Sequence, residues 1–322
     1  MRAESRARRT RAPRSAALAL ALALAVHACS GEDVVLGDGR PTLDAAAQPD
    51  TGAQPDTGAQ PDDAGRAPTF SEPTAITAIA AEDAIDDDPS LSADRTLLYF
   101  NSERPDGAGE EDIWFSTRAA SELPWQPPEP AVELNTESRE TGIALAPDAL
   151  TIWWSSDRAG GAGGLDVYMA TRASRGDAWS SALRVAELSS AGDDLISAVA
   201  DSERSVLLAR RDDDEDDYDL FTAQRSERAQ PWNEPLPIAE LNTDDEESDA
   251  FLLAGGSQLL FTRDGDLQLA TRGPAGLFAE PVALESLNSD DDDRDAWAAE
   301  DFGYIVFSSD RSGAHLLYEA SR

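Results

Sequence analysis

The chain has 322 residues, 41% of them hydrophobic and 28% charged, which is enough apolar material for one large domain or two small ones. Its formal net charge of −37 disfavours binding to nucleic acid and to anionic lipid head groups, and favours cations and basic protein surfaces. A single Cys and two His exclude an internal disulfide, a thiolate metal cluster and a multi-His zinc site, and they argue against a Ser/His/Asp triad.

Residues 1–28 have the layout of a bacterial export signal. An Arg-rich start precedes an apolar stretch from Ser15 to Val26, about 12 residues long, whereas a membrane-spanning helix needs roughly 20. The segment that ends at Cys29 (Val-His-Ala-Cys) resembles the lipobox of bacterial lipoproteins. The resemblance implies that Cys29 is acylated, becomes the mature N-terminus and anchors the protein to a membrane. An ordinary secretory signal with an incidental Cys and an amphipathic or buried helix are the alternatives.

Residues 29–68 form the next predicted segment, an acidic linker. It has no apolar periodicity, and the phrase AQPDTG recurs almost unchanged between Ala47 and Asp62. Low hydrophobicity, Pro and repeated Asp predict a disordered, self-repelling spacer. It would hold the folded part away from the membrane surface.

Residues 69–322 contain five related units. In each unit a strongly apolar run ends in a bulky residue, at Phe100, Trp154, Leu208, Phe261 and Phe307. A period near 50 with several short strands per unit is typical of β-propeller blades. Each unit has a weakly apolar strand, the strong run, a third strand that starts at Asp and ends near Arg in four of the units, and an outer strand introduced by an aromatic residue.

The fifth unit stops at Arg322, before any outer strand of its own. The sequence Phe-Ser-Glu-Pro at residues 70–73 has the character of that missing piece. We therefore predict an all-β fold, a five-bladed propeller of four-stranded blades in which the N-terminal strand completes the last blade and leaves no open sheet edge.

The phrases SLSADRTLLYFNSERPDGAGEEDIWFSTR and ALAPDALTIWWSSDRAGGAGGLDVYMATR, around Phe100 and Trp154, resemble the TolB-type, WD40-like propeller repeat of exported bacterial proteins. The resemblance covers about residues 69–322 and is weaker in the third to fifth units. It implies a periplasmic or surface propeller that contacts other proteins. Because TolB has six blades, a six-bladed ring is the alternative fold.

An acidic residue stands 14 positions before each bulky anchor. These five form a candidate acidic rim at one mouth of the central channel: Asp86, Glu140, Asp194, Glu247 and Asp293. Three positions earlier, four of five repeats are again acidic and could hold Ca²⁺: Asp83, Glu137, Asp244 and Asp290. Two interpretations stay open, since the rim carboxylates could fasten the repeats through hydrogen bonds or attract a cation or basic segment.

The sequence favours a non-enzymatic, lipid-anchored protein-interaction module of the cell envelope. It would lie on the periplasmic face of the outer membrane or at the cell surface. The expected partners are the membrane, through Cys29, and an envelope protein or basic segment; nucleic acid is not expected, and the protein is expected to be a monomer. The only cofactor predicted is Ca²⁺ at the acidic mouth, with no catalytic residues. The alternative is a carbohydrate-binding or glycosidase-like propeller, but repeats this alike do not single out a pair of catalytic carboxylates.

Overall fold

The computed structural model describes residues 67–322 except 82–83, 201 and 213–216. Chain contacts separate the unit Ala64–Arg322 from Met1–Asp63. The predicted export signal with Cys29 and nearly all of the predicted linker lie outside the described residues. Within the described part, no helix is both long and apolar enough to cross a membrane.

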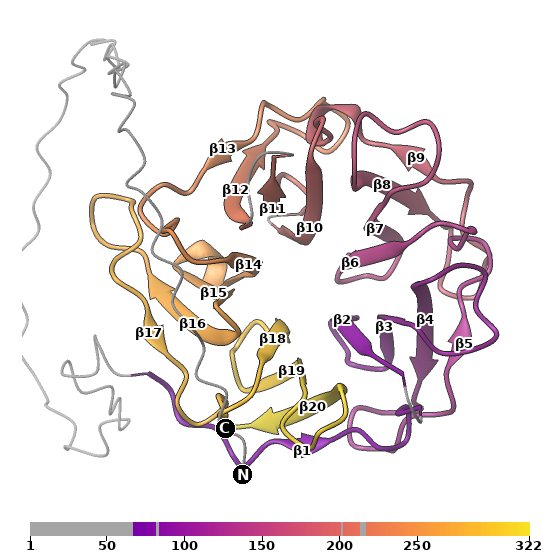
Figure 1. Ribbon diagram of the computed structural model, residues 1–322, viewed down its shortest axis with the longest axis horizontal. Helices are drawn as coiled ribbons and strands as arrows, with labels where there is room; N and C mark the ends of the chain where they lie inside the picture. Colours follow the sequence, from indigo (N-terminus) through magenta and orange to yellow (C-terminus); the bar gives the residue numbers. More distant parts are fainter. Residues whose placement is uncertain (1–66, 82–83, 201, 213–216) are drawn as a thin grey trace, which may run out of the picture. The chain divides into compact units, whose positions relative to one another are not determined.

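Five four-stranded antiparallel sheets stand around a central channel, each forming one blade (Figure 1). From the channel outward, blade 1 has β2 (Asp86–Leu91), β3 (Leu97–Ser102), β4 (Asp112–Thr117) and β5 (Glu129–Pro130), and blade 2 has β6 (Glu140–Leu145), β7 (Thr151–Ser156), β8 (Asp166–Thr171) and β9 (Leu183–Arg184). Blade 3 has β10 (Asp193–Ala200), β11 (Ser205–Arg211), β12 (Asp219–Gln224) and β13 (Leu236–Pro237), and blade 4 has β14 (Glu247–Leu253), β15 (Gln258–Arg263), β16 (Asp266–Thr271) and β17 (Val282–Ala283).

Blade 5 closes the ring with strands from both ends of the described chain. It consists of β18 (Asp293–Ala298), β19 (Tyr304–Ser309), β20 (Leu316–Ser321) and, outermost, β1 (Thr74–Ala75). Thr74 pairs with Glu319 and Ala75 with Tyr318. The prediction of five blades closed by the N-terminal strand is confirmed, and the six-bladed alternative is wrong, because the described residues form five sheets.

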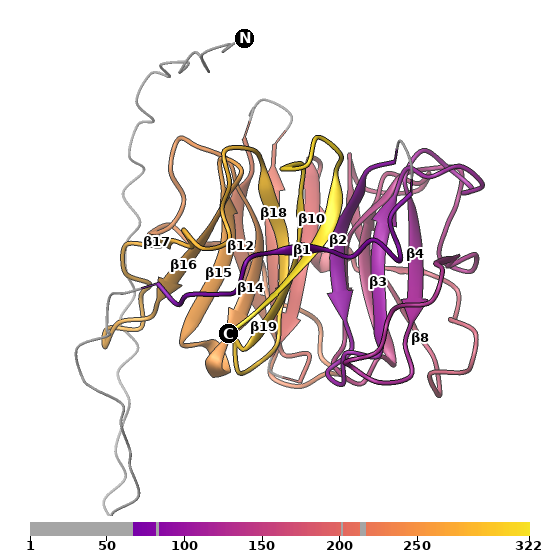
Figure 2. The same cartoon turned by 90° about the horizontal axis from the view of Figure 1, so that it is seen from below.

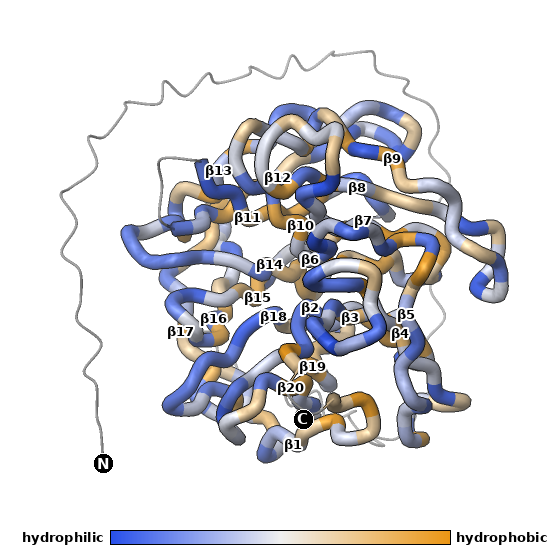
Figure 3. Tube along the Cα trace, turned by 45° about the vertical axis from the view of Figure 1, so that its right-hand side comes forward, coloured by the Kyte–Doolittle hydropathy of each residue, from blue (hydrophilic) through white to orange (hydrophobic). Residues whose placement is uncertain are grey.

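The second strand of each blade carries the strong apolar run because neighbouring blades cover both of its faces. Every residue of β3, β7 and β19 is buried. Figure 2 shows the ring from its edge, with the strands of the blades standing side by side, and Figure 3 shows hydrophobic stretches on the strands with hydrophilic residues over most loops. Two short 3-10 helices, Ala186–Leu188 and Ala254–Gly256, complete the regular structure.

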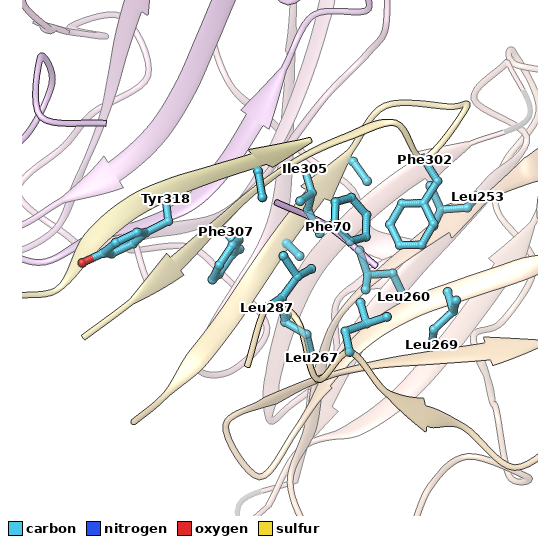
Figure 4. Close-up of a cluster of buried hydrophobic side chains, with 14 residues drawn as sticks. Phe70, Leu253, Leu260, Leu267, Leu269, Leu287, Phe302, Ile305, Phe307 and Tyr318 are labelled. Carbon is cyan, nitrogen blue, oxygen red and sulfur yellow. The ribbon is translucent and has the colours of Figure 1, made fainter. Parts of the chain in front are cut away.

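The apolar core is divided into five clusters, one between each pair of adjacent blades. Figure 4 shows the cluster between blades 4 and 5, where Leu260 and Leu267 meet Phe307. Phe70 enters this cluster from the N-terminal segment and packs edge-on against Phe302, with the two ring centres 5.1 Å apart. The segment that closes the ring is thus held by core packing as well as by β1.

The aromatic residue that introduces each outer strand stacks under the Arg that ends the third strand. In four blades the guanidinium carbon lies 4.1 Å from the ring centre: Arg118 on Trp125, Arg172 on Trp179, Arg225 on Trp232 and Arg272 on Phe278. The fifth pair joins the two ends of the described chain, with Arg322 5.9 Å from Phe70. Cation–π contact therefore recurs in every blade, including the composite one.

Candidate functional site

The five predicted rim carboxylates stand at or next to the first residue of each inner strand and are completely buried. Each pairs with an Arg of its own blade: Asp86 with Arg104, Glu140 with Arg158, Asp194 with Arg210, Glu247 with Arg263 and Asp293 with Arg311. The same guanidinium also donates to a backbone carbonyl in the connection from the preceding blade, as Arg158 does to Leu134 at 2.8 Å. These carboxylates therefore fasten that connection to the inner and second strands of the blade.

Two sequence solutions supply the fastening Arg. In blades 1, 2 and 5 a Ser-x-Arg phrase begins at the last residue of the second strand and supplies the guanidinium. In blades 1 and 2 the Ser hydroxyl also donates to the carboxylate, as Ser156 does beside Arg158 at Glu140. In blade 5 the hydroxyl oxygen of Ser309 accepts from Arg311. In blades 3 and 4 an Arg replaces that Ser within the strand. Burial raises the pKa of Asp86, Asp194 and Glu247, although the paired Arg opposes the shift.

The four acids predicted to hold Ca²⁺ do not form a site among the described residues. Asp83 lies outside the described part, and Glu137, Asp244 and Asp290 are exposed in the loops that precede three inner strands. None of these three belongs to a described group whose ligand atoms converge within 4.8 Å.

A different set of carboxylates, which the sequence analysis missed, converges in the channel. Asp88, Asp249 and Asp295 stand two residues after the fastening acids of blades 1, 4 and 5, and their ligand oxygens lie within 4.8 Å of one another. Because blade 5 adjoins both blade 4 and blade 1 in the ring, these are three consecutive blades. We call these three residues the channel triad.

Backbone bulges position the channel triad. The register of the inner strands shifts at this point, and all three Asp residues have a positive φ, of 49° or 55°. Asp tolerates this left-handed conformation because its short polar side chain bonds locally, and a bulge re-aims the side chain. Blade 2 has Gly142 at the equivalent place, also with positive φ. Blade 3 has the β-branched Ile196, which stays paired with Leu208.

Each triad residue uses its Oδ2 atom to bind the scaffold. Asp88 Oδ2 accepts hydrogen bonds from the Thr141 hydroxyl and the Gly142 N–H at 2.9 and 2.7 Å. Asp249 Oδ2 accepts one from Ser248 and Asp295 Oδ2 accepts one from Ser308, both at 2.5 Å. These scaffold hydrogen bonds of the three carboxylates thus all end on Oδ2.

The triad lines a small cavity in the channel of about 20 Å³. This is roughly the space that one water molecule requires, so it suits a single ion or the tip of one side chain. Phe251 and Trp297 also line it and pack edge-on with ring centres 6.2 Å apart. The cavity thus combines an acidic layer with an aromatic wall.

The charges of the triad are poorly compensated. Burial is the main cause, and the negative charge of Asp249 the second cause, of the rise in the pKa of Asp88 to about 8. The same two causes raise the pKa of Asp295 well above its ordinary value. Crowded carboxylates in a dry site either hold a proton or bind a cation.

Around the triad, further charged side chains surround the channel. His315 Nε2 lies 2.6 Å from Asp87 Oδ1, and Arg294 lies 2.6 Å from Asp292. Two further ion pairs join Arg139 to Glu111 and Arg211 to Asp193. Nearby carboxylates, Asp295 and Asp292 foremost, raise the pKa of Arg294 although burial opposes the shift.

The comparisons with known proteins concern architecture. No protein-family model matches the chain, and no curated protein matches it. A putative TolB from Agrobacterium tumefaciens is 12% identical with a TM-score of 0.47, over 76% of this chain and 79% of that one. The α-L-arabinofuranosidase PaAbf62A from Podospora anserina, in complex with cellotriose, is 10% identical with a TM-score of 0.47, over 79% and 95%. The family 117 glycoside hydrolase Zg3597 from Zobellia galactanivorans is 11% identical with a TM-score of 0.46, over 79% and 90%.

Proposed function

We propose that this protein is a non-enzymatic binding propeller of the cell envelope, held to a membrane through Cys29, whose channel binds a cation and whose acidic surface engages a basic segment of another envelope protein. The observation that carries the proposal is the channel triad. Three carboxylates from consecutive blades bring ligand oxygens within 4.8 Å of one another and line a cavity of ionic size.

Ca²⁺ fits the chemistry of the triad best. It prefers carboxylate oxygens, takes six to eight ligands at 2.3–2.6 Å and accepts irregular geometry. Oxygens bound to one such ion lie no more than about 5 Å apart, and the triad oxygens, all within 4.8 Å of one another, meet this condition. Backbone carbonyls and water molecules would complete the coordination.

The partner is argued from charge and from the N-terminal sequence. Without residues 1–28, 62 acidic and 20 basic residues remain. A field of this sign steers basic surfaces toward the protein. The export signal predicted at residues 1–28 and the lipobox-like segment at Cys29 support a partner in the envelope.

The triad does not favour a carbohydrate-active function. A sugar ring needs far more room than the triad cavity of about 20 Å³ gives. The fastening acids, which recur in every blade, are buried against Arg rather than open to a substrate.

Calorimetry on the full chain tests the cation site. We expect Ca²⁺ to bind one site per chain, and Asp88→Asn or Asp249→Asn to weaken binding at least tenfold, because each removes one charged ligand. The matched control is Asp290→Asn, which removes an exposed carboxylate and should leave the affinity unchanged. Absence of Ca²⁺ binding, or equal loss in the control, would refute the site.

Affinity capture from envelope extract tests the partner. Wild type and the Asp88→Asn/Asp249→Asn double variant are compared in Ca²⁺ and in chelator. We expect a basic envelope protein to be retained by wild type in Ca²⁺ and lost from the double variant. Identical capture under all four conditions would show that the channel has no part in partner binding.

A further inference from the structure

His315 is the only His in the described part of the chain, and the repeat places it at the channel. It stands directly before β20, and its backbone carbonyl accepts the N–H of Asp86 at 3.4 Å. In blades 1 and 3 the equivalent carbonyls belong to Glu111 and Tyr218, which bind the fastening acids of blades 2 and 4 in the same way. The backbone of the hairpin is therefore shared by the repeats, whereas the imidazole is specific to blade 5.

The imidazole belongs to a second converging group. A ring nitrogen of His315, a carboxylate oxygen of Asp87 and one of Asp295 all lie within 4.8 Å of one another. Asp87 comes from β2 of blade 1, and Asp295 comes from β18 of blade 5. These three residues sit across the junction where the last blade meets the first.

The contact between His315 and Asp87 has an unusual geometry. Nε2 and Oδ1 are only 2.6 Å apart and both atoms are buried, yet neither has an aligned hydrogen-bond partner. Buried polar atoms of this kind require a partner. A cation bound beside Nε2 and Oδ1 would provide one to both atoms.

We propose that Asp87, Asp295 and His315 form a binding site for a divalent first-row transition ion, of which Zn²⁺ is the representative. An imidazole nitrogen with two carboxylate oxygens suits Zn²⁺, with bonds of about 2.0–2.2 Å, and suits Ca²⁺ poorly. Bonds of that length at a tetrahedral ion place ligand atoms about 3.3 Å apart, so Nε2 and Oδ1, now 2.6 Å apart, would separate by about 0.7 Å. Water would fill the remaining positions.

This site is distinct from the channel triad, although Asp295 belongs to both. Asp88 and Asp249 serve only the triad, whereas Asp87 and His315 serve only the zinc site. Arg294, adjacent to Asp295 in the chain and near Asp87 and Asp249, offsets part of the negative charge that the groups share. The shared carboxylate gives the two sites a common member and otherwise separate ligands.

The test uses the full chain carrying Cys29→Ser, which removes its only thiol. Zn²⁺ binding is measured by calorimetry, and Co²⁺, an ion with visible d–d absorption, reports coordination directly. We expect His315→Gln and Asp87→Asn each to lower Zn²⁺ affinity at least tenfold and to abolish the Co²⁺ bands. Asp290→Asn, which removes an exposed carboxylate that belongs to neither group, should leave both signals unchanged, and Asp295→Asn should weaken Zn²⁺ and Ca²⁺ alike.

The outcomes separate this inference from the cation proposal. Unchanged Zn²⁺ affinity and Co²⁺ spectrum in His315→Gln would overturn the zinc site even if Ca²⁺ still binds. Zn²⁺ binding that depends on His315 without any Ca²⁺ binding would support the zinc site and refute the triad as a calcium site. A circular dichroism spectrum and melting temperature like those of wild type confirm that each variant is folded.

Discussion

Acidic residues two positions apart serve different purposes in this propeller. Glu140 is completely buried, and its neighbour Arg158 balances its charge. Asp88 and Asp295 are also surrounded by protein, but carboxylates rather than an Arg are their closest charged neighbours, with Arg294 as the partial exception. What distinguishes a fastening acid from a ligand is therefore the availability of a paired cation.

Removal of a fastening Arg should be costly. Arg158→Ala leaves Glu140 buried without its partner, and we expect a loss of about 3–5 kcal/mol in the free energy of unfolding. The comparison is Arg175→Ala, which breaks an exposed pair with Asp94 whose side chains are 38% and 51% exposed, and should cost under about 1 kcal/mol. Urea denaturation measures both. Equal losses would mean that burial of the pair does not decide its contribution.

At the level of the element, the inner-strand bulge decides what reaches the channel. In a regular strand the second residue after a buried acid points to the same face as that acid. A residue with positive φ breaks this alternation, and in four blades this residue is an Asp or a Gly. In blade 3 the residue is Ile196, which does not have a positive φ, so this blade contributes no carboxylate to the triad. The asymmetry of the site thus arises from one position of the repeat.

Gly142 tests the bulge. Its φ is +61°, and a Cβ there would stand 2.7 Å from Leu195 Cδ1 and 2.8 Å from the Ile196 carbonyl oxygen. Because a backbone atom cannot move aside cheaply, we expect Gly142→Ala to destabilise the protein by roughly 1–3 kcal/mol. Gly176→Ala is the control, since nothing lies within 4 Å of its Cβ position. Thermal unfolding measures both variants. Equal melting temperatures would show that Gly142 does not need its left-handed conformation.

At the level of the whole molecule, closure of the ring creates both proposed sites. Asp88 and Asp295 are more than 200 residues apart in the chain, and blade 5 brings them together. Its outermost strand, β1, pairs with β20 through two residues, and Phe70 adds core packing beside them. Opening of this blade would separate ligands as well as expose the core.

A disulfide across the closure should stabilise the ring more than one within a blade. In Cys29→Ser protein, Thr74→Cys with Glu319→Cys closes a loop of about 246 residues, whereas Phe115→Cys with Glu129→Cys, at the equivalent register of blade 1, closes about 15. The chain-entropy difference is about 2.5 kcal/mol. The oxidised-minus-reduced melting temperature should therefore be about 5–10 °C larger for the first pair. Equal shifts would indicate that the closure does not limit unfolding.

The sequence alone determined the repeat, the blade number and the closing segment. Burial of a strand between neighbouring blades demands a continuous apolar run, and five such runs at Phe100, Trp154, Leu208, Phe261 and Phe307 are visible without coordinates. The fifth unit lacks an outer strand, and the segment that begins at Phe70 has the character of one. A closed ring needs this strand, so the sequence predicts that the segment completes the fifth blade. The acid that recurs before each inner strand was also visible, with fastening and cation attraction left as its two interpretations.

The tertiary structure decided which acids face the channel. Asp two residues after the fastening acid occurs in three of the five repeats, so a signal for the triad existed, but the strand period assigns that position to the blade interior. Only the bulge reverses this assignment. The convergence of His315 with Asp87 likewise depends on the junction of the last blade with the first. Periodicity records which face a residue shares with its neighbours in the chain, whereas a site made by ring closure depends on residues that the sequence holds far apart.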